Sequence, residues 1–217
     1  MSLRSLSVAV GIIASATGMA MADGTGILTT GAYSSGSGGE FTATTISGFI
    51  GLSGLPADLD SETFQTFCLE VNETFSPGST YNMVINTVAF AGGSGGPFLA
   101  LDERAAYLYH NFRNMTLTGY DYTAGGRQAS AGDLQAALWY IQGNQSGGAN
   151  NAFVALADAA VSSGEWSGLG DVRVLNLYDA DGGFHQDVLT IIPAPGATAL
   201  LGLAGLMAGR RRRASNA

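Results

Sequence analysis

The chain has 217 residues and a net charge of −8, and it contains 32 glycines and no lysine, so all nine of its cations are arginines. Five of these arginines lie at the two ends, at positions 4 and 210–213, which leaves four arginines against all seventeen acids in between and a charge of −13 for that stretch. Such an acidic stretch repels phosphates, which excludes nucleic-acid binding. Hydrophobic residues make up 46% of the chain, which excludes a disordered protein and predicts one domain with a buried core.

Residues 1–22 have the layout of a secretory signal peptide. Arg4 forms a short cationic start, a mostly apolar run follows over Leu6–Ala16, and Ala20 and Ala22 form a small-x-small cleavage site. We therefore expect signal peptidase to cut after Ala22 and the rest of the chain to be exported.

The C-terminal segment, residues 192–217, begins with Pro193, Ala194 and Pro195, and the two prolines end any preceding strand because they have no amide hydrogen to donate. Residues 196–209 carry no charge and would form a helix of about 21 Å, short of the ~30 Å hydrocarbon core of a bilayer. A cluster of four cations follows and would anchor the segment on the cytoplasmic side. These cations are Arg210, Arg211, Arg212 and Arg213.

The order of proline pair, short apolar helix and arginine cluster over Ile192–Arg213 resembles the PEP-CTERM sorting signal of exported bacterial proteins. The resemblance implies transient anchoring in the inner membrane, cleavage near Pro193–Pro195 by an exosortase-type processing enzyme, and delivery to the cell envelope or an extracellular matrix. Ala194 stands where the family usually has glutamate, and a permanent tail anchor is the alternative.

The exported body, residues 23–191, changes its hydrophobic period twice along the chain. Strand patterns are followed by helical spacing and then by strand patterns again, which predicts an α+β fold with a sandwich-like antiparallel sheet and an inserted bundle of two to three helices. The expected strands are 26–29, 40–50, 63–71, 81–90, 172–178 and 185–192. The expected helices are 102–114, 130–142 and 150–163, the second of them capped by Ser130 with Asp133 in a capping box.

Cys68 is the only cysteine of a chain that we expect to be exported. It therefore has three possible fates: a buried and inert core residue, a partner in an intermolecular disulfide, or a chemically special thiol. Burial is the commonest of these for a lone cysteine, which behaves as a small hydrophobe.

Two short motifs resemble those of the thioester domains of bacterial surface adhesins. The segment Thr66–Glu70 (TFCLE) is similar to an aromatic-Cys-aliphatic-acid strand motif, and Leu134–Trp139 (LQAALW) is similar to a Gln-x-Ala-aliphatic-Trp helix motif. The resemblance implies that the sulfur of Cys68 and the side-chain carbonyl of Gln135 are joined in an internal thioester, with Trp139 shielding the bond from water.

Such a bond would attach the protein covalently to a target that bears an amine or a hydroxyl. The chemistry requires the thiol on a strand and the carboxamide on an abutting helix, and Gln135 and Trp139 share a helix face because they are four residues apart. This predicts an attachment module and no turnover enzyme. The rival hypothesis is a structural envelope or matrix protein in which Cys68 belongs to the core.

Other candidate sites are less specific. A dyad of Cys68 with His110 or His185 is arithmetically possible, but no feature of the sequence places either histidine beside the cysteine. Asp179 and Asp181 resemble the start of a calcium loop, but a hairpin turn explains them better because the later ligands of such a loop are missing. We expect no metal and no cofactor.

Overall fold

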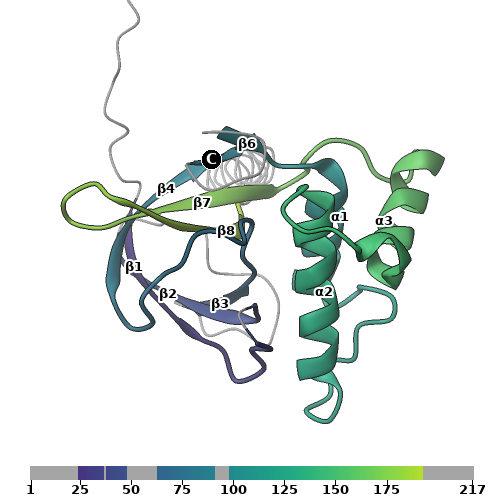
Figure 1. Cartoon of the computed structure of the whole chain (residues 1–217), viewed down its shortest axis with the longest axis horizontal. Coiled ribbons are helices and arrows are strands. Elements are labelled where there is room, and N and C mark those ends of the chain that lie inside the picture. The colour runs from purple at the N-terminus through teal and green to yellow at the C-terminus, as the bar shows by residue number, and fades with distance from the viewer. Residues whose placement is uncertain (1–23, 37, 48–62, 91–97, 193–217) are drawn as a thin grey trace, which may run out of the picture.

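A computed structural model describes residues 24–36, 38–47, 63–90 and 98–192 (Figure 1). In this part of the chain, six antiparallel strands form one sheet in the order β3-β2-β1-β4-β7-β8. These strands are β1 (Gly24–Thr30), β2 (Phe41–Ser47), β3 (Thr63–Thr66), β4 (Thr80–Asn86), β7 (Val172–Tyr178) and β8 (Phe184–Ile191). A separate hairpin pairs β5 (Val88–Phe90) with β6 (Phe98–Ala100). The α+β class is confirmed.

The six-stranded sheet curls until its two edges meet. Just after β3, Cys68 forms an antiparallel bridge with Val188 of β8. The amide of Leu69 donates to the carbonyl of Asp187 (3.1 Å), and the amide of Leu189 donates to the carbonyl of Phe67 (3.2 Å). The segment 67–69 therefore satisfies backbone groups that an open edge strand would leave unpaired.

Three helices follow the first strands and lie beside the curled sheet (Figure 1). Helix α1 (Glu103–Arg113) begins where the Asp102 side chain accepts from the amide of Arg104, and α3 (Ala152–Ser163) begins where Asn151 accepts from the amide of Phe153, at 2.8 Å in both cases. Helix α2 (Arg127–Ile141) lies between them in sequence, and a short 3-10 helix (Gly148–Asn150) precedes α3. The three helices confirm the predicted bundle.

The predicted start of α2 is wrong. The helix begins at Arg127 after Gly126, which has no side-chain capping bond, so Ser130 and Asp133 lie inside the helix. The hydroxyl of Ser130 instead accepts from the amide of Asp121 (3.0 Å). The earlier start has a tertiary cause, because it brings the Arg127 side chain onto the buried carboxylate of Glu40.

Several strand boundaries also differ from the sequence-based expectation. The predicted strand 63–71 is regular only to Thr66, and the predicted strand 81–90 divides into β4 and β5. Strand β6 has no counterpart among the predicted strands. Within the described residues, the strand predicted over 40–50 runs from Phe41 to Ser47.

Buried residues form two clusters. One lies between the helices and the strands that face them. The other contains side chains from β1, β2, β3, β4, β7 and β8, together with Cys68, and so fills the inside of the curled sheet. Cys68 therefore lies in the core at the point where the sheet closes.

Candidate functional site

Cys68 is held at the seam of the sheet and is fully buried as a free thiol. Around it, Thr66 donates from its hydroxyl to the carbonyl of Leu189 (2.6 Å), and Asn144 donates from its side-chain amide to the carbonyl of Leu69 (3.0 Å). These bonds fix the backbone on both sides of the cysteine. Burial, and secondarily the nearby charge of Glu70, raise the pKa of the Cys68 thiol well above its ordinary value.

Helix α2 presents the side chain of Gln135 to Cys68. The carboxamide is buried and pairs with the backbone of the cysteine: its Nε2 donates to the Cys68 carbonyl (2.8 Å), and its Oε1 accepts from the Cys68 amide (3.0 Å). The carboxamide carbon is bonded to both of these atoms, so it is held beside the residue that carries the thiol. The structure thus brings together the two residues that the motifs paired.

A second backbone amide points at the same oxygen. The amide of Gly39 donates to Oε1 of Gln135 at 3.2 Å. This glycine belongs to the segment between β1 and β2, whose described residues 31–36 and 38–40 we call the β1–β2 loop. The carbonyl oxygen of Gln135 therefore accepts two N–H groups, which is the geometry that stabilises a developing oxyanion in acyl transfer.

The β1–β2 loop lies along α2 and covers the carboxamide. Gln128 donates from its side-chain amide to the carbonyl of Ser34 (2.7 Å). At Gly38, an added Cβ would lie 2.4 Å from Cγ of Gln135 and 3.2 Å from Cη2 of Trp139, so only glycine fits against the helix there. The sequence gave no sign that this glycine lies against Gln135.

Trp139 lies one helical turn beyond Gln135, as the motif implies. It is half-buried and packs against the cluster that contains Cys68. Its indole Nε1 is buried without a hydrogen-bond partner. The ring thus contributes apolar cover near the Cys68–Gln135 pair.

Two buried carboxyl groups, Glu70 and Asp187, lie close to the cysteine in sequence or across the seam. The amide of Asp187 donates to Oε2 of Glu70 (3.2 Å), while Oδ2 of Asp187 accepts from the amide of Phe90 (2.6 Å) and the side chain of Asn176 (2.8 Å). Burial and the charges of Asp187 and Glu73 raise the pKa of Glu70 to about 9. Burial likewise raises the pKa of Asp187 to about 7. Burial of the pair therefore favours the protonated form of Glu70, which no sequence motif indicated.

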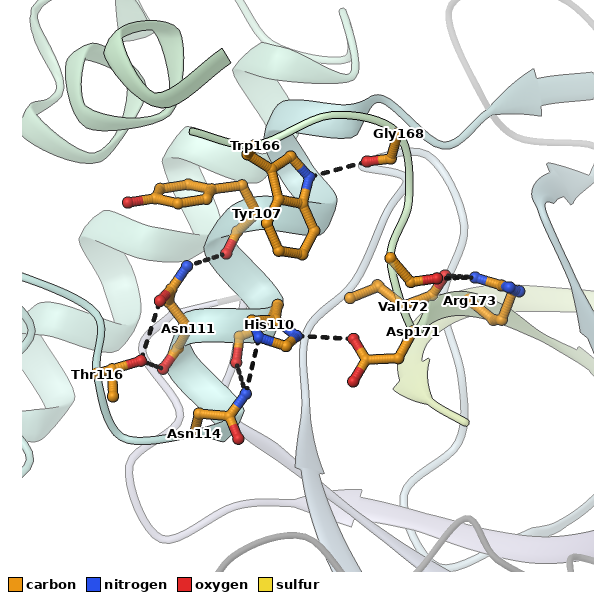
Figure 2. Close-up of polar contacts among 11 residues, drawn as sticks. Tyr107, His110, Asn111, Asn114, Thr116, Trp166, Gly168, Asp171, Val172 and Arg173 are labelled. Atoms are coloured by element: carbon orange, nitrogen blue, oxygen red, sulfur yellow. Dashed lines mark hydrogen bonds and ion pairs between the residues drawn. The ribbon is translucent and has the colours of Figure 1, made fainter. Parts of the chain in front are cut away.

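Neither histidine forms a dyad with Cys68. Figure 2 shows His110 between Asp171, whose Oδ1 lies 2.7 Å from Nδ1, and Asn114, whose Nδ2 lies 3.1 Å from Nε2. His185 places its Nε2 3.5 Å from Oδ2 of Asp179, on the β7–β8 hairpin. Both histidines thus have partners away from the cysteine.

The aspartates of the β7–β8 hairpin form a turn. Asp179 Oδ1 accepts from the amides of Asp181 (2.9 Å) and Gly183 (2.7 Å), and these backbone bonds help to lower the pKa of Asp179. Among the described residues, no group of three or more histidine, cysteine and acidic side chains is arranged to hold a metal ion.

The predicted targeting segments lie outside the described residues. This applies to Ala20 and Ala22, to Pro193–Pro195 and to Arg210–Arg213. Within the part of the chain that the structure describes, no helix has the length and apolar character needed to cross a bilayer.

Comparisons with known proteins give no relative for this chain: no protein-family model, no curated protein and no solved structure matches it.

Proposed function

We propose that this protein is exported to the cell envelope or an extracellular matrix and attaches covalently to a target through a thioester between Cys68 and Gln135. Export is supported by the layout of residues 1–22, and sorting by the PEP-CTERM-like order of Ile192–Arg213. In this proposal signal peptidase and an exosortase-type enzyme process the chain, and the C-terminal segment anchors it transiently in the inner membrane. The body between the two ends carries the reactive pair.

The hydrogen bonding of Gln135 is the observation that carries the proposal. Its carbonyl oxygen accepts from the amides of Cys68 (3.0 Å) and Gly39 (3.2 Å). A nucleophile that attacks the carboxamide carbon places negative charge on this oxygen, and backbone donors that are already aimed at it lower the barrier. A merely structural glutamine needs partners for its oxygen, but it does not need one of them to be the residue that carries the thiol.

Formation of the bond is an acyl transfer. The sulfur of Cys68 attacks the carboxamide carbon of Gln135, the C–N bond breaks, and the thiol proton leaves with the amide nitrogen as ammonia. In the second step an amine attacks the thioester carbon, the C–S bond breaks, and a proton from the amine restores the Cys68 thiol. The product is an amide bond between Gln135 and the target.

The surroundings of the pair protect such a bond from hydrolysis. Cys68 and Gln135 are buried, and Gly38 lies against Cγ and Cβ of Gln135. Trp139 packs against the cluster that contains Cys68. Exclusion of water slows the competing hydrolysis and strengthens the hydrogen bonds to the oxyanion.

Intact mass spectrometry of the exported protein tests the proposal. We expect a mass lower than that of the processed chain by one ammonia, and addition of methylamine at Gln135. Cys68→Ala should show the full mass and no adduct, whereas Gln145→Ala, at an exposed glutamine beyond α2, should keep both the ammonia loss and the adduct. A full-mass wild-type protein that methylamine does not modify would instead support the structural role in which Cys68 is a core residue.

The same spectra report on the two ends of the chain. The proposal expects an N-terminus at Asp23 and, after processing, a C-terminus near Pro193–Pro195. A chain that keeps Arg210–Arg213 after export would contradict removal of the anchor and support a permanent one.

A further inference from the structure

Four aromatic side chains form a continuous patch where the β5–β6 hairpin meets the turn end of the β7–β8 hairpin. The ring centroid of Phe90 on β5 lies 5.2 Å from that of Phe98 on β6 and 6.2 Å from that of Phe184 on β8. The ring centroid of Phe184 in turn lies 5.3 Å from that of Tyr178 on β7. Phe98 is 61% exposed and Phe184 is 53% exposed. We call these four residues the aromatic patch, and such a gathering of exposed apolar side chains marks a surface for an apolar partner.

The aromatic patch is a fixed part of the fold. Asn176 of β7 donates from Nδ2 to the carbonyl of Val88 on β5 (3.0 Å), and the amide of Phe90 donates to Oδ2 of Asp187 on β8 (2.6 Å). These bonds tie β5 to β7 and β8. A movement of the β5–β6 hairpin therefore cannot bury the exposed rings unless both bonds break.

Two aspartates border the aromatic patch at the turn of the β7–β8 hairpin. Asp179 directly follows Tyr178, and Asp181 lies two residues further along the same turn. Asp181 is exposed, and the side chain of Asp179 is 44% exposed. A complementary partner is therefore apolar over the aromatic patch and cationic beside the turn.

The C-terminal segment of the same chain has this order of properties. Residues 196–209 carry no charge and Arg210–Arg213 follow them directly, and both ranges lie outside the described residues. Leu200, Leu203 and Met207 have the spacing of one helix face, so a helix here would present one row of large apolar side chains. We propose that this segment docks on the aromatic patch of its own chain before it enters the membrane, with its arginines beside the β7–β8 turn.

The length and direction of the chain fit this docking. Strand β8 runs from Phe184 to Ile191, about 23 Å at ~3.3 Å per residue, so the chain leaves the sheet at the end of β8 away from the aromatic patch. Residues 192–195 would extend over about 12 Å at ~3.1 Å each, which carries the chain from the sheet to a helix on its outer side. A helix of residues 196–209 spans about 21 Å, so on running back along β8 it brings its arginine end level with Phe184.

Docking resolves the exposure of two apolar surfaces at once. The uncharged run is short for a bilayer core of ~30 Å, and outside the membrane it needs cover from water. Cleavage near Pro193–Pro195 would remove the segment and leave the processed body with a bare aromatic patch. This inference goes beyond the proposed function and does not depend on the thioester.

Disulfide trapping on the chain from Asp23 to Ala217 tests the docking. In a Cys68→Ala background, Met207→Cys is combined with Phe184→Cys or with Phe98→Cys, whose side chains are more than half exposed. The matched control combines Met207→Cys with Ile46→Cys, at a residue that is 55% exposed on β2, which β3 separates from β8. In oxidised glutathione without detergent, we expect the two patch pairs to form an intramolecular disulfide at least about tenfold faster than the control pair, because docking holds their Cβ atoms close.

Salt tests the placement of the arginines. The trapping rate of the Phe184 pair should fall severalfold between about 0.05 and 0.5 M salt, because the attraction between the arginines and the aspartates of the turn is screened, and Asp181→Asn should reduce this dependence.

Three results would overturn the docking. These are equal trapping rates at the aromatic patch and at Ile46, disulfides that form only between molecules, and a rate that salt leaves unchanged. Failure of the docking is distinguishable from failure of the proposed function, because ammonia loss and processing of the chain ends are read from the intact mass of the protein with its native Cys68.

Discussion

Gly38→Ala is the sharpest test of the way in which the β1–β2 loop covers the candidate site. The added Cβ would lie 2.4 Å from Cγ and 3.2 Å from Cβ of Gln135. These atoms form the base of a buried side chain on α2 and cannot move aside as the tip of a flexible chain would, so the loop must shift. Overpacking of this kind costs about 1–3 kcal/mol. Loss of the Gly39 hydrogen bond adds about 0.5–1.5 kcal/mol.

We therefore expect Gly38→Ala to lower the free energy of unfolding by about 2–4 kcal/mol, measured by urea denaturation. Displacement of the Gly39 amide also removes one donor to the carbonyl oxygen of Gln135. Methylamine coupling should then slow by roughly 10²-fold in the folded protein, by analogy with the loss of one oxyanion donor.

Gly125→Ala is the matched control, because a Cβ there meets no atom within 4 Å and the backbone has no positive φ. Gly125→Ala should leave the free energy of unfolding and the rate of methylamine coupling near their wild-type values. The reasoning is refuted if Gly38→Ala unfolds at the same urea concentration as Gly125→Ala, or if it destabilises the protein but couples methylamine at the wild-type rate.

Three further predictions concern buried polar groups. Gln135→Ala leaves the amide and carbonyl of Cys68 without their partner and should destabilise the protein by about 2–4 kcal/mol in urea, more than the exposed Gln145→Ala. Arg127→Met leaves the carboxylate of Glu40, which is 1% exposed, without its ion-pair partner and should cost about 3–5 kcal/mol, whereas Arg127→Lys should cost less. The pKa of Glu70 is raised from 4.5 to about 9, so the native state holds a proton that the unfolded chain releases, and the free energy of unfolding should fall as pH rises from 6 to 9. The slope is at most about 1.4 kcal/mol per pH unit for this proton, and a Glu70→Gln variant with an unchanged slope would contradict the assignment.

The helices could be predicted from the sequence because local signals agree with their packing. Asp102 and Asn151 cap α1 and α3 with the bonds that such residues make at helix starts. The helical spacing of the apolar residues also indicated which face of each helix is buried. At α2 the sequence-based start was wrong. Ser130 is a suitable capping residue, but the helix begins earlier, at Arg127, whose side chain pairs with the distant Glu40.

Only the two short motifs allowed the pairing of Cys68 with Gln135 to be predicted from the sequence. The lone Cys68 could be expected in the core from its residue type, but period and composition carry no information on its contact with Gln135, 67 residues away. The Gly39 amide and the tight fit at Gly38 could not be predicted, because a glycine cluster looks the same whether it turns in solvent or packs on a helix. Closure of the sheet at Cys68 and Val188 is likewise a long-range pairing without a local signature.

The raised pKa of Cys68 bears on what kind of reactivity the site supports. A buried thiol whose pKa is well above its ordinary value is a poor nucleophile, so formation of the proposed thioester depends on position and on the two amides at the Gln135 oxygen. The same burial acts in the opposite direction once the bond exists. Cleavage of the thioester C–S bond expels the sulfur of Cys68 as a thiolate, and a thiolate with a raised pKa is a poor leaving group. The environment that slows formation therefore also preserves the bond against water until a bound nucleophile reacts. A site built in this way favours one lasting attachment per molecule over repeated turnover.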